Sequence, residues 1–204
     1  MTTSDKNDKN INDIILDATL NTLAKNKISG TRMHLIAAEA GTSQSNLHYH
    51  YPTKNDLLLA ALDKIQKYFS QKRTASVDFD RKSSGQNLHA LFEEKQDDIL
   101  HHPDIDCIQF DYWVQGTVNP AIREKFRQSF DIWRADIQKV LAACQADGEE
   151  LDMDAFAHLM VSILMGASMQ YLIDDGSFSL DAYFALAERM VRGALGAAPK
   201  TEHS

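Results

Sequence analysis

The feature that most constrains the fold is a pair of short helical segments separated by one glycine. Thr31 is a suitable N-cap for a segment from Met33 to Ala40, and Gly41 follows that segment. Glycine readily adopts the left-handed backbone conformation that ends a helix. Ser43 is a favourable N-cap for a second segment, from Gln44 to about Tyr49. Two short helices joined by such a turn indicate a helix-turn-helix.

Most other segments have the three-to-four-residue apolar spacing of amphipathic helices, and strand alternation is rare. Further helices are expected from residue 11 to 26, 54 to 73, 88 to 102, 105 to 119, 122 to 147, 153 to 172 and 180 to 195. The sequence therefore predicts an all-α fold with nine helices in two domains. Residues 1–58 would form the helix-turn-helix domain, the helix continuing to about 73 would be a connector, and residues 59–204 would form a second domain.

Composition excludes several classes of protein. The chain has 204 residues, of which 44% are hydrophobic and 25% charged, which is typical of a globular protein. Its only cysteines, Cys107 and Cys144, are too few for a disulfide framework or a four-thiolate zinc site. The longest mostly apolar run, from Leu159 to Met169, is shorter than the roughly 20 residues of a membrane helix. The polar N-terminus lacks a secretory signal, so we expect a cytoplasmic protein.

Charge is distributed unevenly along the chain. Residues 1–73 contain ten Lys or Arg and seven Asp or Glu, whereas residues 74–204 contain eleven and twenty-two. The first third therefore carries a charge of +3 and the remainder −11, which together give the net charge of −8. This distribution favours contact between the first third and phosphate, while the rest repels it.

Residues 15–58 resemble the DNA-binding domain of the tetracycline-repressor (TetR) family of bacterial regulators. The matching stretches are Ile15-Leu16-Asp17-Ala18, Thr31, Ile36-Ala37, Ala40-Gly41-Thr42-Ser43 and Leu47-His48-Tyr49-His50-Tyr51-Pro52-Thr53-Lys54, with Leu57-Leu58. The resemblance implies a homodimer that represses a promoter and releases it when a small molecule enters the C-terminal domain. No cofactor is implied.

Three positions depart from the family pattern. The family usually has Gly where Lys27 stands, Val where Thr42 stands and Phe where Tyr51 stands. Lys27 affects the conformation of the loop after the first helix. If this loop needs a residue with positive φ, Asn26 or Gly30 can adopt it. Thr42 retains a methyl group for the core, and Tyr51 retains the ring.

The expected DNA contacts fall into two classes. Side chains near the N-terminus of a helix in the major groove read base edges, which makes Gln44, Ser45 and Asn46 the candidates for sequence reading. The resemblance places His48 and Tyr49 at backbone phosphates, while His50 and Tyr51 pack inward. Lys54 begins the fourth helix, where its ammonium and free backbone N–H groups can hold one phosphate. Thr31 and Arg32 are expected to hold the flanking phosphate.

The second domain offers aromatic and thioether side chains that either line a ligand pocket or form only a core. The candidate ligand-binding residues are Phe92, Phe110, Trp113, Val114, Phe130, Trp133, Met165 and Met169. Four nearby polar residues can supply contacts, namely Asp106, Gln109, Asp111 and Gln115. Acidic groups near aromatic rings would suit a cationic or amine ligand.

The last two predicted helices combine apolar seams with small residues, which favours a four-helix dimer interface. The candidate dimer residues are Phe156, Met160, Ile163, Ala167, Tyr183, Ala187, Met190 and Ala194. A purely intramolecular core would have the same pattern.

Other functions remain as alternatives. His101, His102, Asp104, Asp106 and Cys107 have metal-ligand chemistry but no established ligand spacing, so no metal site is expected. Because no catalytic motif is found, we expect a regulator and not a helical enzyme. Its partners would be double-stranded operator DNA and a small-molecule effector, with control by a protein partner as the alternative.

Overall fold

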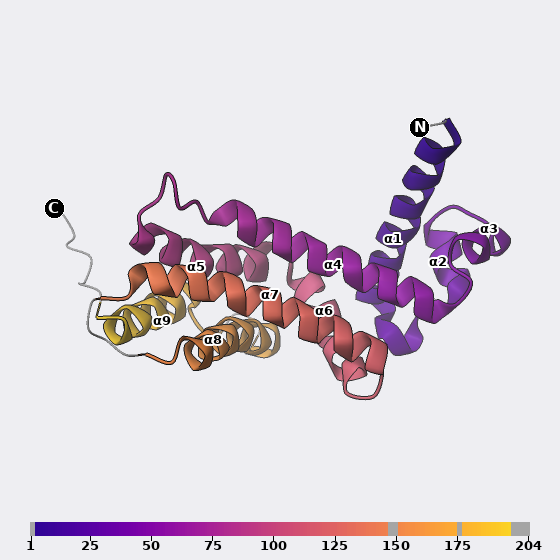
Figure 1. Cartoon of the computed structure of the whole chain (residues 1–204). Coiled ribbons are helices and arrows are strands. Elements are labelled where there is room, and N and C mark those ends of the chain that lie inside the picture. The colour runs from indigo at the N-terminus through magenta and orange to yellow at the C-terminus, as the bar shows by residue number, and fades with distance from the viewer. Residues whose placement is uncertain (1–2, 147–150, 175–176, 197–204) are drawn as a thin grey trace. The chain divides into compact units, whose positions relative to one another are not determined.

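The computed structural model describes residues 3–146, 151–174 and 177–196, with side chains from residue 11 onward (Figure 1). Within these residues the chain is all-α and forms nine helices, as predicted. They are α1 (Thr3–Gly30), α2 (Met33–Glu39), α3 (Gln44–His50), α4 (Lys54–Ser76), α5 (Ser84–His101), α6 (Pro103–Gly116), α7 (Pro120–Cys144), α8 (Met153–Asp174) and α9 (Leu180–Ala194). Gly148, the expected end of the seventh helix, lies outside the described residues.

The largest differences at helix starts are in α1, which begins at Thr3 instead of residue 11, and in α5, which begins at Ser84 instead of residue 88. The earlier start of α5 has a local cause, a pair of hydrogen bonds at Ser83. The Ser83 side chain accepts a hydrogen bond from the Gln86 N–H at 3.2 Å, and the Gln86 side chain accepts one from the Ser83 N–H at 2.8 Å. This reciprocal capping box stabilises a helix start four residues earlier than the apolar pattern indicates.

The described chain divides into two compact units, which we call unit 1 and unit 2. Unit 1 contains the residues up to Tyr68 together with Asp104–Arg127, and unit 2 contains Phe69–Pro103 and the residues from Gln128 onward. This division differs from the predicted boundary at residue 58, because α6 clusters with the N-terminal helices. Helices α4 and α7 each contribute residues to both units.

Unit 1 has a small apolar core that holds the helix-turn-helix. Its buried residues are Ile15, Ala18, Ile36, Ala37, Leu47 and Leu57. Leu35, which precedes the buried pair on α2, is 36% exposed. Helix α6 joins this unit through two hydrogen bonds: the Tyr112 hydroxyl donates to the Leu58 carbonyl at 2.8 Å, and Asp111 accepts from the Ile28 N–H at 2.5 Å.

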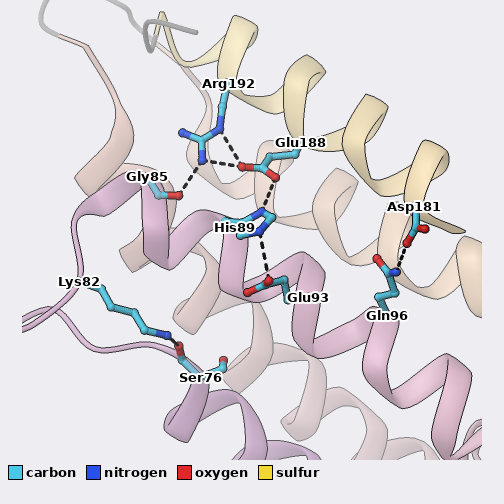
Figure 2. Close-up of polar contacts among 9 residues, drawn as sticks. All are labelled: Ser76, Lys82, Gly85, His89, Glu93, Gln96, Asp181, Glu188 and Arg192. Carbon is cyan, nitrogen blue, oxygen red and sulfur yellow. Dashed lines mark hydrogen bonds and ion pairs between the residues drawn. The ribbon is translucent and has the colours of Figure 1, made fainter. Parts of the chain in front are cut away.

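Unit 2 has a larger core, formed by α5, α7, α8 and α9. The buried residues include Leu88, Phe92, Ile137, Leu141, Met160, Leu164, Phe184 and Val191. Helices α5 and α9 are also tied by polar contacts, in which His89 lies within 2.6 Å of Glu188 and Arg192 donates to the Gly85 carbonyl at 2.6 Å (Figure 2). Helix α8 is long and apolar enough to cross a membrane by length and composition alone, a property that core helices share.

Candidate DNA-binding and ligand-binding sites

The turn between α2 and α3 has the geometry predicted for it. Gly41 has a φ of 63°, in the left-handed region. The Ser43 side chain caps α3 by accepting a hydrogen bond from the Asn46 N–H at 3.1 Å. Leu47 is fully buried and anchors α3 to the core of unit 1. These contacts fix α3 so that its opposite side faces solvent.

Two of the three predicted base-reading residues lie open on α3. Gln44 and Ser45 are exposed. Asn46 is half-buried, and its side-chain amide donates a hydrogen bond to the Thr42 hydroxyl at 2.8 Å. The Asn46 amide therefore helps to hold the turn, which leaves Gln44 as the exposed amide for reading a base. The hydroxyl of Thr42, where the family has valine, makes this contact possible.

The two predicted phosphate contacts on α3 are also at the surface. Tyr49 is 79% exposed, and its ring packs edge-on against His50 with 5.2 Å between ring centroids. His48 is exposed, and its Nδ1 lies 3.1 Å from the Pro52 carbonyl oxygen. Because that contact involves only Nδ1, the second ring nitrogen of His48, Nε2, can still contact a phosphate.

The prediction for Thr31 is wrong. Thr31 is fully buried, and its hydroxyl donates a hydrogen bond to the Lys27 carbonyl at 2.7 Å. The side chain is therefore unavailable to a phosphate, and it does not cap α2, whose N-cap is Arg32. Arg32 is exposed and donates through Nη1 to the carbonyl oxygens of Ser29 at 2.6 Å and Thr31 at 3.1 Å.

Lys54 lies at the start of α4, beside reciprocal hydrogen bonds between Thr53 and Asp56 that cap the helix. Its ammonium donates to the Ile28 carbonyl at 2.7 Å. Burial, and then the neighbouring charge of Arg32, lower the pKa of Lys54. An ammonium has three donors, so the contact with Ile28 still permits a phosphate contact, which stays a prediction.

Lys27 itself adopts the unusual backbone conformation, and neither Asn26 nor Gly30 does so. Its φ of 57° and ψ of 172° interrupt α1. This region of conformational space strongly favours glycine, the residue that the family pattern has here. The Lys27 ammonium donates to the Ala24 carbonyl and to Cys107 Sγ, each at 3.1 Å.

The predicted ligand-binding residues are divided between the two units. Phe110, Trp113 and Val114 belong to unit 1, where Trp113 is 48% exposed and Val114 is 55% exposed. Phe92, Phe130, Trp133, Met165 and Met169 belong to unit 2. There Phe92 is buried in the core, whereas Met169 is 54% exposed. Their role in binding stays a prediction.

Within unit 2, Phe130 and Trp133 form an aromatic pair that carries charged neighbours. Their rings are stacked with 6.4 Å between centroids and 13° between planes. The Arg73 guanidinium lies over the Trp133 ring at 5.1 Å. Sequence reasoning missed Arg73, although it follows Leu62, Ile65 and Phe69 at the helical spacing of a buried face.

Unit 2 also contains a groove of about 910 Å³ between α5 and α9. Of the predicted ligand set, Phe92 lines it, and the polar side chains along it include His89, Glu93, Glu188 and Arg192 (Figure 2). Burial opposes ionisation of Glu188, but hydrogen bonds from His89 and Arg192 outweigh it and lower the pKa of Glu188. The acid is thus held ionised and already paired.

Three of the predicted dimer residues are wrong. Met160, Ala167 and Ala187 are buried in the core of their own chain and cannot contact a partner. Phe156, Ile163 and Tyr183 are half-buried, and Met190 and Ala194 are exposed. The apolar side chains that α8 and α9 expose most are Leu159, Met169, Ile173, Leu186 and Met190.

Comparisons with known proteins agree with this arrangement. Residues 15–61 match the family described as "Bacterial regulatory proteins, tetR family", and residues 88–196 match the "BetI-type transcriptional repressor, C-terminal". The HTH-type transcriptional regulator BetI of Cronobacter sakazakii is 25% identical over 191 residues, which cover 91% of each chain.

Two solved structures share the fold. A putative transcriptional regulator from Saccharomonospora viridis, solved in complex with choline, has a TM-score of 0.80 and 25% identity, over 90% of this chain and 96% of that one. A TetR transcription regulator from Haloarcula marismortui has a TM-score of 0.78 and 22% identity, over 92% of this chain and 97% of that one. The chain belongs to the TetR family of bacterial transcriptional regulators, with a C-terminal region of the BetI type.

Proposed function

We propose that this regulator is a homodimeric repressor that binds a palindromic operator through α3 and releases it when a small molecule binds. The observation that carries the proposal is the solvent-facing side of α3, with Gln44, Ser45 and Tyr49 exposed on a helix that Ser43 and Leu47 fix in place. Residues 1–58 would supply DNA binding and residues 59–204 ligand binding and dimerisation, with α4 as the connector. The protein would act in the cytoplasm and need no cofactor.

The chemistry of the exposed face suits DNA. A glutamine amide can donate to N7 and accept from N6 of adenine, so Gln44 would read a base. The Tyr49 hydroxyl and the His48 imidazole are donors for phosphate oxygens, which position the helix without reading sequence. A symmetric dimer would place two such helices in half-sites about 34 Å apart, one turn of DNA.

Dimer formation is supported by the exposed apolar side chains of α8 and α9. We expect Leu186→Glu combined with Met190→Glu to weaken the dimer at least about 100-fold, because a carboxylate in an apolar interface has no partner. Light scattering would then fall from twice 22.9 kDa to 22.9 kDa at micromolar concentration. Ala185→Glu, which alters an exposed position on the groove side of α9, is the matched control. A double variant that stays dimeric would refute this interface.

Release by a small molecule is supported by the choline complex of the Saccharomonospora viridis regulator. The experiment is a titration of the chain's own upstream promoter DNA, with and without each compound of a metabolite panel, at fixed salt. We expect one class of compound to weaken operator binding by about 5 to 150-fold. If the operator binds tightly and no compound changes its affinity, control by a protein partner becomes the better explanation.

A further inference from the structure

Three aromatic rings in unit 2 each lie beneath a cation of the same chain. Arg73 lies 5.1 Å from the Trp133 ring centroid, Lys95 lies 5.7 Å from that of Phe69, and Arg134 lies 5.9 Å from that of Phe130. The six residues come from α4, α5 and α7. We call them the cation–aromatic cluster. An external organic cation would seek the same ring faces, which this chain already covers.

Two of the three cations are buried, which makes them costly to keep charged. Arg73 is 7% exposed and Lys95 is 6% exposed. By contrast, the Arg134 side chain is 19% exposed and forms an ion pair with Asp131 at 2.5 Å. Arg73 Nε is buried and donates no hydrogen bond to any residue that the structure describes. A buried donor in this state is suited to an acceptor other than the described residues.

Three carboxylates act on the Arg73 charge, those of Glu94, Asp136 and Asp98, but burial outweighs them and lowers the pKa of the guanidinium. Asp98 is only 1% exposed and is bound to Lys72, which also contacts Asp97 at 2.7 Å. Burial and the negative charge of Asp98 raise the pKa of Glu94 to about 7, against the opposing effect of Arg73. Glu94 is thus partly protonated near neutral pH and neutralises Arg73 incompletely.

We propose that Arg73, Phe130 and Trp133 of this cluster bind the effector and that the effector is an anion, a carboxylate on an apolar body. This inference rests on the proposed ligand-responsive function and names the ligand class. The carboxylate would accept from Arg73, and the apolar body would lie against Phe130 and Trp133, which are only half-buried and therefore reachable. A quaternary ammonium such as choline would meet like charge at the same rings.

Trp133 provides a direct signal for the test. The chain has two tryptophans, so Trp113→Phe leaves Trp133 as the only one. In that background the dimer is titrated with benzoate, phenylacetate and octanoate, and separately with choline, at matched ionic strength. We expect a saturable change in Trp133 fluorescence with at least one carboxylate and no saturable change with choline.

Variants then assign the signal to Arg73. Arg73→Gln should weaken carboxylate binding at least about 10-fold, since a hydrogen bond to a charged group is lost. Arg134→Gln is the matched control, because it removes a cation over the neighbouring ring that is already paired, and binding should persist. Circular dichroism checks that each variant is folded. If Arg73→Gln does not fold, Arg73→Lys replaces it, because lysine keeps the charge. Arg73→Lys should lower the affinity for the carboxylate by a smaller factor than Arg73→Gln.

The outcomes separate this inference from the proposed function. No response to all three carboxylates, equal binding by Arg73→Gln, or saturable choline binding would overturn the anion assignment. If choline or another class nevertheless releases the operator, the ligand-responsive function stands and only the ligand class is wrong. If carboxylates bind at Trp133 without changing operator affinity, the site is correct and the inducer function fails.

Discussion

The helices that carry the DNA-binding face and those that carry the cation–aromatic cluster bury different kinds of polar group. In the first region the buried polar residues are Thr19, Thr22 and Thr31, and each hydroxyl donates to the carbonyl four residues earlier at 2.7 Å. In the second region Arg73, Lys95 and Asp98 are buried with their charges. Neutral, locally satisfied groups cost little, whereas buried charges depend on partners from other helices.

This difference suggests different tasks for the two regions. The DNA-binding face presents Gln44 and Tyr49 on a helix that is already fixed by its cap and its buried leucine, so it can meet a partner without rearrangement. The cation–aromatic cluster holds charges whose balance an added anion would change. A ligand shifts an equilibrium only through such differential interactions, so we expect regulation to begin in unit 2.

The largest expected effect tests whether the two units are separate folding elements. Leu47→Ala removes a fully buried side chain from the core of unit 1 and should cost about 2 to 5 kcal/mol. Trp113 lies in unit 1 and Trp133 in unit 2, so single-tryptophan variants report on each unit by fluorescence melting. We expect the Trp113 transition to shift more than the Trp133 transition. Leu164→Ala in the unit 2 core should do the reverse, and equal shifts in both cases would remove the distinction.

The next prediction concerns how Glu94, beside the buried charges of unit 2, makes the stability of the protein depend on pH. The pKa of Glu94 is raised from 4.5 to about 7, so the folded chain binds a proton that the unfolded chain has released. Its contribution to stability is therefore lost as pH rises from about 4.5 to about 7. Because Glu94 is only half-buried, we expect Glu94→Gln to stabilise the protein at pH 8 by about 1 to 3 kcal/mol. Urea unfolding at pH 5 and pH 8 measures this, and an equal effect at both values would contradict it.

The DNA-binding face was largely predictable because its signals are close together in the sequence. Gly41, Ser43 and Leu47 lie within seven positions, and each acts through local backbone geometry or helical spacing. The misassigned residue there is Thr31, which the sequence predicts to hold a phosphate because a threonine just before a helix usually caps it. Its hydroxyl instead donates to the Lys27 carbonyl four residues earlier, as those of Thr19 and Thr22 do to theirs.

The helices of unit 2 could be predicted from the sequence, but the cation–aromatic cluster could not. The cluster combines residues of three helices, such as Arg73, Lys95 and Trp133, which lie up to 60 positions apart in the sequence. Neither helical spacing nor a short motif predicts that such distant residues meet. Three dimer residues were misassigned for a related reason. Helices α8 and α9 have apolar residues on more than one side, so periodicity could not separate the side that packs inward at Ala167 from the side that stays exposed at Met190.

A smaller effect tests the division between base reading and positioning on α3. Gln44→Ala should cost about 1 to 3 kcal/mol on the operator and relax preference at one base pair. Tyr49→Ala should weaken binding to operator and random DNA alike, because a phosphate contact has no base information. Fluorescence anisotropy with both DNAs across a salt series compares the two variants. Equal losses on both DNAs for Gln44→Ala would show that Gln44 does not read a base.

The smallest effect concerns the strained residue near the C-terminal end of α1. Lys27 has a φ of 57° and a ψ of 172°, a conformation that costs a residue with a side chain about 1 to 3 kcal/mol. Lys27→Gly relieves this strain but gives up two exposed contacts and adds freedom to the unfolded chain, so we expect a net gain of about 1 kcal/mol. Lys25→Gly is the matched control, since Lys25 is exposed, helical and paired with Glu39 at 3.2 Å, and glycine there should cost about 1 kcal/mol. The melting temperature followed through Trp113 should therefore rise for Lys27→Gly and fall for Lys25→Gly. A decrease of similar size in both variants would mean that the surrounding contacts, and not the backbone of Lys27, determine stability at this position.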